Sequence, residues 1–271
     1  MARMDVEWVA FTAGLKPAIR RTVEPARADE TEARLRASGA AVLRARETAV
    51  FGAREEVVLY VAATEAAAVA LRDAEAPVLP GRVTATDLPG AHRAVGRALG
   101  FPLCCVDAFC GRIARGVDRL VAGGPGGFAE DYVAARAAWV RRPDPRVNPL
   151  LMRMGAQLVS FYPCRFDCAA AVAQAEALRA EVARRSPEAA RTLMSTLSRS
   201  VVIAGDGARA QVILDASGVV VRAAGEEPFA SGLVGARVGE EGAVSGVTAV
   251  RGEAPWCVDF GGASGGVVAS G

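Results

Sequence analysis

Apolar and polar positions follow clear secondary-structure patterns in the first third of the chain. Residues 41–51 and 55–63 are rich in β-branched and aromatic side chains, which predicts two strands. Thr64 then precedes an alanine-rich run that reaches Pro77, which predicts a capped helix. Strand, strand and helix in this order predict a small α/β module over residues 1–86.

The earlier elements of this module are shorter. Residues 5–12 are predicted to form a strand, followed by a short helix that Pro17 breaks. Residues 28–38 are predicted to form a helix, with Asp29 or Thr31 as its capping residue.

Helical patterns dominate the next segment and predict a central helical domain over residues 87–198. Prolines begin several of these helices, and glycine or proline ends them. The predicted helices span residues 89–99, 102–116, 128–140, 150–161, 166–185 and 187–198. The glycine-rich stretch 123–127 matches no phosphate-binding fingerprint, so we interpret it as a turn.

Short apolar runs separated by glycine and aspartate predict a β-rich module over residues 199–271. Its Gly- and Ser-rich tail is expected to fray. The expected fold class is therefore α+β, with an N-terminal α/β module, a central helical cysteine domain and a C-terminal β-rich module.

Composition narrows the functional classes. Hydrophobic residues make up 52% of the 271 residues, and the net charge is only +2 with acids and bases interleaved. A nucleic-acid partner is not expected, because such proteins usually carry a clustered basic face. The apolar runs are shorter than the roughly 18 residues that a membrane span needs, and the first residues resemble a secretory signal poorly. We expect a cytoplasmic protein with no membrane partner.

Four of the six cysteines lie in two similar motifs, in which an aromatic residue and a proline precede the thiols. The motifs are Phe101-Pro102-Leu103-Cys104-Cys105 and Tyr162-Pro163-Cys164-Arg165-Phe166-Asp167-Cys168. Proline is favoured at the first position of a helix, so both cysteine groups are predicted to lie in a first helical turn. Backbone N–H groups and the helix dipole stabilise thiolates there. Clustered cysteines in a reducing compartment indicate metal binding or catalysis more often than disulfides.

The spacing of these thiols favours a cluster over a single ion. Cys164 and Cys168 would share one face of a helix, but the adjacent Cys104 and Cys105 would diverge by about 100°. A [4Fe-4S] cluster with these four ligands is therefore the favoured cofactor. Zinc is the alternative, although zinc sites usually show paired Cys-x₂-Cys knuckles. If one thiol of the adjacent pair is the weaker ligand, we expect Cys105 to be retained and Cys104 to lie nearer the helix mouth.

Charged residues beside the motifs are the candidate catalytic groups. Arg165 is a candidate to bind an anionic substrate or a cluster sulfur, and Asp107 and Asp167 are candidate proton carriers or substrate contacts. Ordinary solvation or capping explains all three equally well. His92 is the only histidine, so Cys-His or Ser-His-Asp catalysis would have to use it. Cys110 and Cys257 are interpreted as core residues.

The two motifs Gly100-Phe101-Pro102-Leu103-Cys104-Cys105 and Tyr162-Pro163-Cys164-x₃-Cys168 resemble those of an uncharacterised prokaryotic domain family over roughly residues 94–185. There is a looser similarity to the cysteine-rich domains of heterodisulfide-reductase-type proteins, whose adjacent Cys-Cys pair ligates an iron–sulfur centre. Here the upstream cysteine partner is missing, and Cys-x-x-x-Cys replaces Cys-x-x-Cys. The second resemblance implies only that a Cys-Cys pair can ligate a cluster.

These observations predict an iron–sulfur enzyme, such as a lyase, sulfur transferase or oxidoreductase. It would act on a small and possibly anionic molecule, with a possible electron donor. One alternative is a structural zinc or cluster site in a binding protein. A second alternative is a thiol–disulfide oxidoreductase that uses a Cys164/Cys168 or Cys105/Cys164 disulfide.

Overall fold

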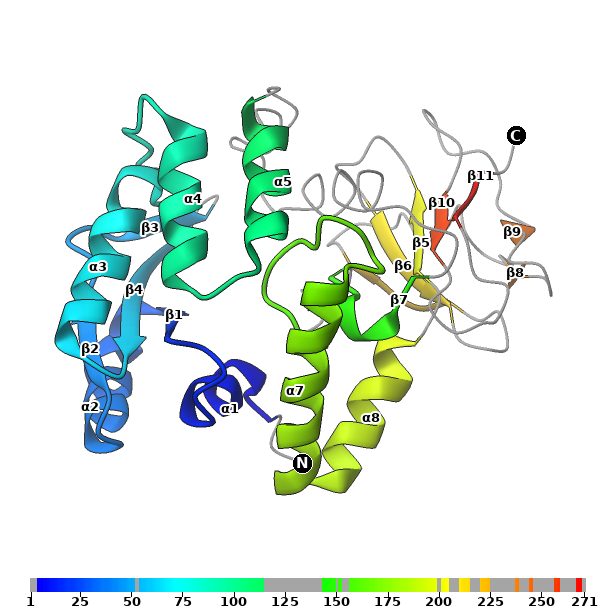
Figure 1. Ribbon diagram of the computed structural model, residues 1–271, viewed down its shortest axis with the longest axis horizontal. Helices are drawn as coiled ribbons and strands as arrows, with labels where there is room; N and C mark the ends of the chain where they lie inside the picture. The colour runs from blue at the N-terminus through cyan, green and yellow to red at the C-terminus, as the bar shows by residue number, and fades with distance from the viewer. Residues whose placement is uncertain are drawn as a thin grey trace. The chain divides into compact units, whose positions relative to one another are not determined.

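The computed structural model describes five stretches of the chain and the strands that follow them. The stretches are residues 4–51, 54–114, 143–149, 151–152 and 156–198, and strands lie after residue 200. The chain divides into two compact units, residues 1–126 and 127–271. Figure 1 labels the helices and strands. Helices and strands are both present, and the first unit contains a sheet, so the mixed α and β class is confirmed.

The sheet of the first unit is antiparallel and built around one long strand. That strand, β4 (Arg54–Ala62), pairs with β1 (Ala18–Val23), β2 (Ala41–Arg44) and β3 (Ala49–Phe51). The strand order is β1-β4-β2, and β3 pairs with the beginning of β4. The predicted strands 41–51 and 55–63 are confirmed, with the first divided into β2 and β3.

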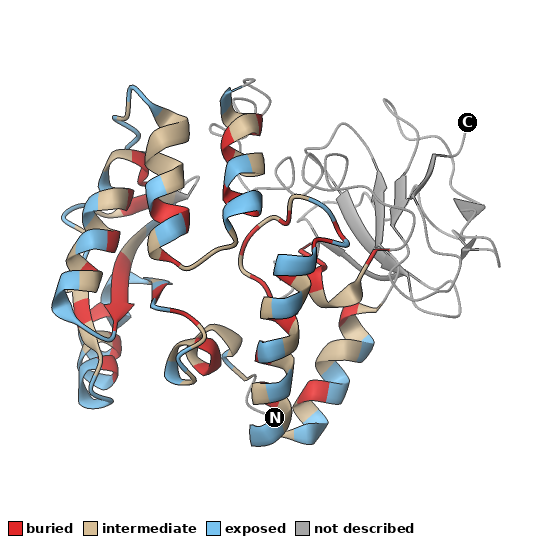
Figure 2. Cartoon of the chain, in the orientation of Figure 1, coloured by how far each residue is buried: buried red, intermediate tan, exposed pale blue. Residues whose placement is uncertain are grey.

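The alternating residues of β4 supply both faces of the sheet. Val58, Tyr60 and Ala62 belong to one buried cluster, which includes residues of the helices α3 (Glu65–Glu75) and α4 (Leu88–Ala98). Leu59 and Val61 belong to a second cluster with Leu35 of the helix α2 (Ala28–Ala37). Because both faces are covered, β4 is buried at every position from residue 58 to residue 62 (Figure 2).

The cap predicted for α2 is wrong, because Arg27 occupies its N-cap position without a side-chain hydrogen bond and Asp29 and Thr31 lie inside the helix. Side chains do cap the next two helices. Thr64 Oγ1 accepts a hydrogen bond of 3.2 Å from the N–H of Ala67 at the start of α3. Asp87 accepts one of 2.9 Å from the N–H of Gly90 at the start of α4. These side chains pair N–H groups that have no partner within the helix. Short 3-10 turns, η1 (Pro25–Arg27) and η2 (Ala76–Val78), precede α2 and follow α3.

The strand predicted over residues 5–12 is wrong. This stretch is the helix α1 (Val6–Thr12), which begins where Asp5 accepts a hydrogen bond of 3.0 Å from the N–H of Trp8. A seven-residue helix buries only a narrow stripe, here Val9 and Ala10, so its period is hard to distinguish from that of a strand. The first strand of the chain is instead β1, whose two adjacent arginines interrupt the apolar pattern that would have predicted it.

The helix α5 (Leu103–Ala114) follows α4 after a sharp turn. Gly100 makes this turn with φ +73°, a conformation that favours glycine. Next to the turn, the ammonium group of Lys16 lies 5.0 Å from the ring centroid of Phe101 and 2.7 Å from Glu7 Oε2. Lys16 is 6% exposed, and its burial lowers the pKa of its ammonium group. The chain is thus held at the entry to α5.

Between residues 143 and 198, the described part of the second unit forms η4 (Pro145–Val147), α7 (Ala169–Arg185) and α8 (Pro187–Leu197). Ser186 caps α8 by accepting a hydrogen bond of 3.2 Å from the N–H of Ala189. The predicted helix over 150–161 is wrong for its described residues 156–161, which are not helical. The predicted helix 128–140 and the turn 123–127 lie outside the described residues.

The strands after residue 200 pair in antiparallel sheets, with the orders β11-β10-β5-β6-β7 and β8-β9. They are β5 (Val201–Ala204), β6 (Ala210–Leu214), β7 (Val220–Ala224), β8 (Arg237–Val238), β9 (Val244–Ser245), β10 (Trp256–Val258) and β11 (Val267–Ala269). The division into modules 1–86, 87–198 and 199–271 stays a prediction. Across the described stretches, the helices are too short or too polar to cross a bilayer.

Candidate metal centre

Cys104 and Cys105 lie in the first turn of α5, where the sequence predicts them. The carbonyl oxygen of Pro102 accepts hydrogen bonds from the N–H groups of Cys105 (2.9 Å) and Val106 (3.0 Å), so Pro102 is the residue before the helix. Cys105 is 1% exposed, whereas Cys104 is exposed. Their sulfur atoms lie 3.9 Å apart. The two adjacent residues therefore hold their thiols close enough to bind the same ligand.

Cys164 and Cys168 lie in a turn, and the prediction that they share a helix face is wrong. The N–H of Cys168 donates a hydrogen bond of 3.1 Å to the carbonyl oxygen of Arg165, which closes the turn. The helix α7 begins one residue later, and its first carbonyl acceptor is that of Cys168, bonded to Val172 N at 2.8 Å. Cys168 thus occupies the N-cap position, but its side chain makes no capping hydrogen bond.

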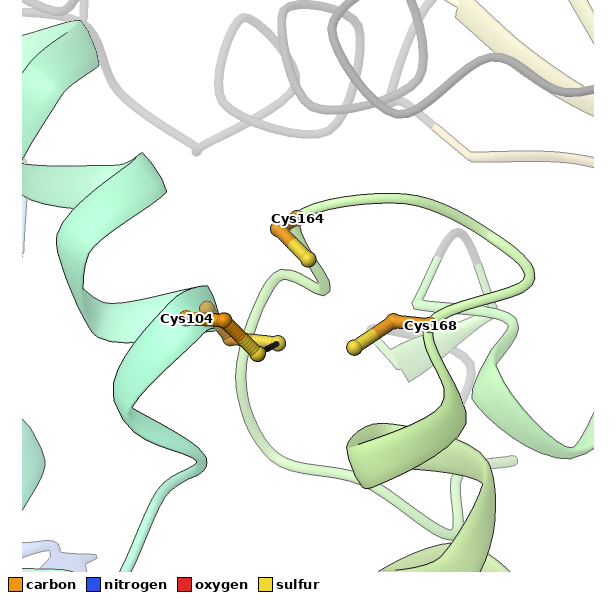
Figure 3. A group of neighbouring side chains, drawn as sticks. Cys104, Cys164 and Cys168 are labelled. Atoms are coloured by element: carbon orange, nitrogen blue, oxygen red, sulfur yellow. Dashed lines mark hydrogen bonds between the residues drawn. The ribbon is translucent and has the colours of Figure 1, made fainter.

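The four motif cysteines form one group of possible metal ligands. The sulfur atoms of Cys104, Cys105, Cys164 and Cys168 all lie within 4.8 Å of one another. Figure 3 shows the side chains of Cys104, Cys164 and Cys168 turned toward one another. Four thiolates at this spacing are a donor set that soft or borderline metal ions bind. The sequence prediction that the thiols of the two motifs come together is confirmed, and the group could hold a metal ion.

Arg165 lies between two of these cysteines and is engaged by its neighbour. Its guanidinium donates two hydrogen bonds to the carboxylate of Asp167, at 2.9 and 2.8 Å. The pKa of Arg165 is raised chiefly by Asp167, with smaller contributions from the charges of Cys164 and Cys168. The guanidinium of Arg165 thus lies beside Cys164 and Cys168, and its hydrogen bonds go to Asp167.

The other predicted residues have local partners. Asp107, on α5, accepts a hydrogen bond of 3.1 Å from Nε of Arg93. The ring of His92 meets that of Phe109 edge to face at 5.4 Å between centroids, and burial lowers the pKa of its imidazole. None of these contacts assigns a catalytic role, so the roles of Asp107, Asp167 and Arg165 stay predictions.

Cys110 lies outside the group, as its interpretation as a core residue requires. Its side chain is buried, and its thiol donates a hydrogen bond of 3.1 Å to the carbonyl oxygen of Pro89. Burial raises the pKa of this thiol, which favours the protonated donor. Cys257 lies in β10, and its side chain is outside the described part of the chain.

One contact that supports the cysteine turn has no signal in the sequence. The N–H of Asp144 donates a hydrogen bond of 2.7 Å to the carbonyl oxygen of Phe166. Phe166 is 0% exposed and lies midway between Cys164 and Cys168. The turn is therefore anchored both by a buried ring and by the chain beside η4.

Comparison of the chain with protein-family models, curated proteins and solved structures finds no match. Any account of its function therefore rests on the chemistry of its own residues.

Proposed function

We propose that this protein binds one tetrahedral metal ion, zinc, through Cys104, Cys105, Cys164 and Cys168, and that the ion has a structural role. The observation that supports the proposal is the spacing of the four sulfur atoms, all within 4.8 Å of one another. With metal–sulfur bonds of about 2.3 Å, the sulfur atoms of a tetrahedral site lie about 3.8 Å apart. The group would contract by no more than about an ångström to reach this geometry.

The adjacent pair supports a single ion in particular. The sulfur atoms of Cys104 and Cys105 are 3.9 Å apart, which corresponds to an angle of about 116° at a metal with bonds of about 2.3 Å. In a [4Fe-4S] cluster each cysteine binds a different iron, so the sulfurs must be separated by the width of the cluster. The spacing therefore favours the zinc alternative over the cluster that the sequence favours.

The ligand set also favours a structural role over catalysis. A catalytic zinc keeps one coordination position for water or substrate, whereas structural sites are closed by four protein ligands. Zinc bound to four thiolates carries a net charge of −2, which the neighbouring Arg165 and the N-terminal turn of α5 would stabilise. Such an ion would join α5 to the turn before α7 and contribute directly to folding free energy.

The deciding experiment is metal analysis of the full chain purified without oxygen. One zinc per chain and no visible absorption are expected. Replacement by Co²⁺ should then give the intense visible bands of tetrahedral sulfur coordination. Brown protein with several irons and matching sulfide would overturn the single-ion site and restore the cluster. Protein that binds no metal and forms a Cys164–Cys168 disulfide would instead support the thiol–disulfide alternative.

A second function is favoured by the exposure of Cys104. A single iron in the same four-thiolate site would carry one electron, and an electron donor needs access to a ligand. Cys104 is exposed, and the neighbouring Leu103 is 58% exposed, an uncommon position for a large apolar side chain. One iron per chain without sulfide, and a reversible one-electron potential, would establish this function in place of the structural one.

A further inference from the structure

The residues of η4, α7 and α8 border an open groove of about 440 Å³. It is lined by Asp144, Pro145, Arg146, Glu176, Arg179 and Met194. All of these residues lie in the second unit, and the metal-binding cysteines do not line the groove. The groove is within the size range of small-molecule sites, roughly 300–1,000 Å³.

The charged side chains of the groove are held in place by one another. Arg146 donates to Asp144 through Nε (2.8 Å) and to Glu176 through Nη1 (3.0 Å). Arg179 donates to Glu176 through Nε at 2.9 Å and through Nη2 at 2.5 Å. Asp144 also accepts from the backbone N–H of Arg146 at 2.9 Å. The guanidinium groups are therefore preorganised, and little side-chain entropy remains to be lost when a ligand binds.

The network leaves donors in excess of acceptors. Both oxygens of Glu176 already accept from arginine, and this lowers the pKa of its carboxyl group to about 2. Within the described residues, Nη1 of Arg179 has no partner. Arg179 carries five N–H donors, and the two contacts to Glu176 use one edge of the fork. An acceptor with a negative charge suits the remaining edge.

The apolar lining adds a second feature of the ligand. Pro145 and Met194 have no side-chain donor, and a thioether is a soft surface that fits varied apolar shapes. We propose that this groove binds a small organic anion, with its carboxylate on Arg179 and its apolar body against Met194 and Pro145. The argument for this groove does not use the proposed metal site, whose cysteines do not line it.

The probe compounds are benzoate, its neutral analogue benzamide, and acetate. The full-length, metal-containing protein is labelled with ¹³C at the methionine methyl groups, and each compound is titrated in turn. Benzoate should shift the Met194 methyl signal to saturation and leave Met152 as an unshifted reference. Acetate should bind more weakly because it lacks the apolar body, and benzamide should cause no saturable shift. An equal response to benzamide, or no response to benzoate, overturns the proposal.

A matched pair of variants identifies the guanidinium. Arg179→Leu should weaken benzoate binding about tenfold or more, because a charge-assisted hydrogen bond is lost. Arg184→Leu is the control, since Arg184 pairs with Glu181 at 2.6 Å on the same helix, with the same i,i+3 spacing, but does not line the groove. If Arg179→Leu fails to fold, Arg179→Lys tests the same point, and it should bind more weakly than the unchanged protein. Unchanged affinity in a folded Arg179 variant, or equal losses in both positions, overturns the assignment.

Discussion

Gly96 of α4 packs directly against Val106 of α5, the residue that follows Cys105. A Cβ atom built on Gly96 would lie 2.7 Å from Cγ2 of Val106 and 3.2 Å from Cγ1, closer than side chains tolerate. Val106 is 5% exposed and β-branched, so it cannot rotate away easily. The position of α5, which carries Cys104 and Cys105 in its first turn, therefore depends on the absence of a side chain at residue 96 of α4.

Gly96→Val is expected to destabilise the protein by about 1–3 kcal/mol, the usual cost of overpacking. Because α5 must move to admit the valine, the variant should also bind metal more weakly. Urea unfolding and metal content measure the two effects. A variant as stable as the original protein would contradict the packing argument.

The control for this prediction is a double-mutant cycle. Val106→Ala removes the two methyl groups that face Gly96 and alone should cost on the order of 1–2 kcal/mol. In the Gly96→Val, Val106→Ala double variant, the combined loss should be smaller than the sum of the single losses, because the new side chain fills the space. Additive losses would mean that the two positions do not meet.

The second prediction separates the four motif cysteines from Cys110. Serine at position 104, 105, 164 or 168 should weaken metal binding by roughly tenfold or more, since even outer-shell changes weaken metal sites by that factor. Cys110→Ser is the control, because its thiol donates to a carbonyl oxygen and lies outside the group. Metal per chain after dialysis against a chelator is the measurement. Equal metal in all five variants would refute the four-cysteine site.

A third prediction concerns the stability of the protein at low pH. The pKa of Glu176 falls from 4.5 to about 2, because Arg179 and then Arg146 donate to its carboxylate. A carboxyl whose pKa is depressed on folding stabilises the protein above its unfolded pKa, and this contribution is lost as pH falls from about 4.5 to about 2. Its size should stay under about 1 kcal/mol, because the pair is more than one-third exposed and screened by water.

Glu176→Gln tests this sign. The stability difference between the original protein and the variant should be largest above pH 4.5 and shrink toward pH 2. Release of metal by acid affects both proteins, so it cancels in the difference. A difference that is constant across this range, or that grows in acid, would mean that Glu176 is not held ionised by the arginines.

The fourth prediction concerns the connection between η4 and α8. Asn148 is 0% exposed, and its side-chain amide donates a hydrogen bond of 2.9 Å to the carbonyl oxygen of Leu197. Asn148→Ala should cost about 1–3 kcal/mol, because a buried acceptor loses this donor. Thr196→Ala is the neighbouring control: its hydroxyl bonds Thr192 O on an exposed turn, so the change should stay within about 0.5 kcal/mol. Similar unfolding midpoints for the two variants would contradict this prediction.

Much of the first unit follows from local sequence signals. The run from Val57 to Ala62 is apolar at every position, and this agrees with a strand covered on both faces. Thr64 caps α3 through a hydrogen bond that reaches only three residues along the chain, so its sequence neighbours suffice to predict it. The same reasoning fails at α2, where Arg27 and neither Asp29 nor Thr31 is the N-cap residue.

Local sequence signals predict that the cysteine motifs come together, but not the conformation of residues 164–168. Their common aromatic-Pro-Cys pattern predicts that the four thiols act together, and the sulfur positions agree. The spacing of Cys164 and Cys168 fits both a helix face and a turn. Tertiary contacts decide between them, through the buried ring of Phe166 and its hydrogen bond from Asp144. The number of metal atoms depends on sulfur–sulfur distances, which a sequence does not contain.

The buried ammonium group of Lys16 makes the chain unusual in its chemical labelling. It is the only lysine among 271 residues, and its side chain is enclosed by Glu7 and Phe101. An amine-reactive reagent meets one side-chain amine per molecule, and only after the segment before β1 has opened. The rate of acylation at this position therefore measures local opening beside the cysteine helix, without any engineered probe.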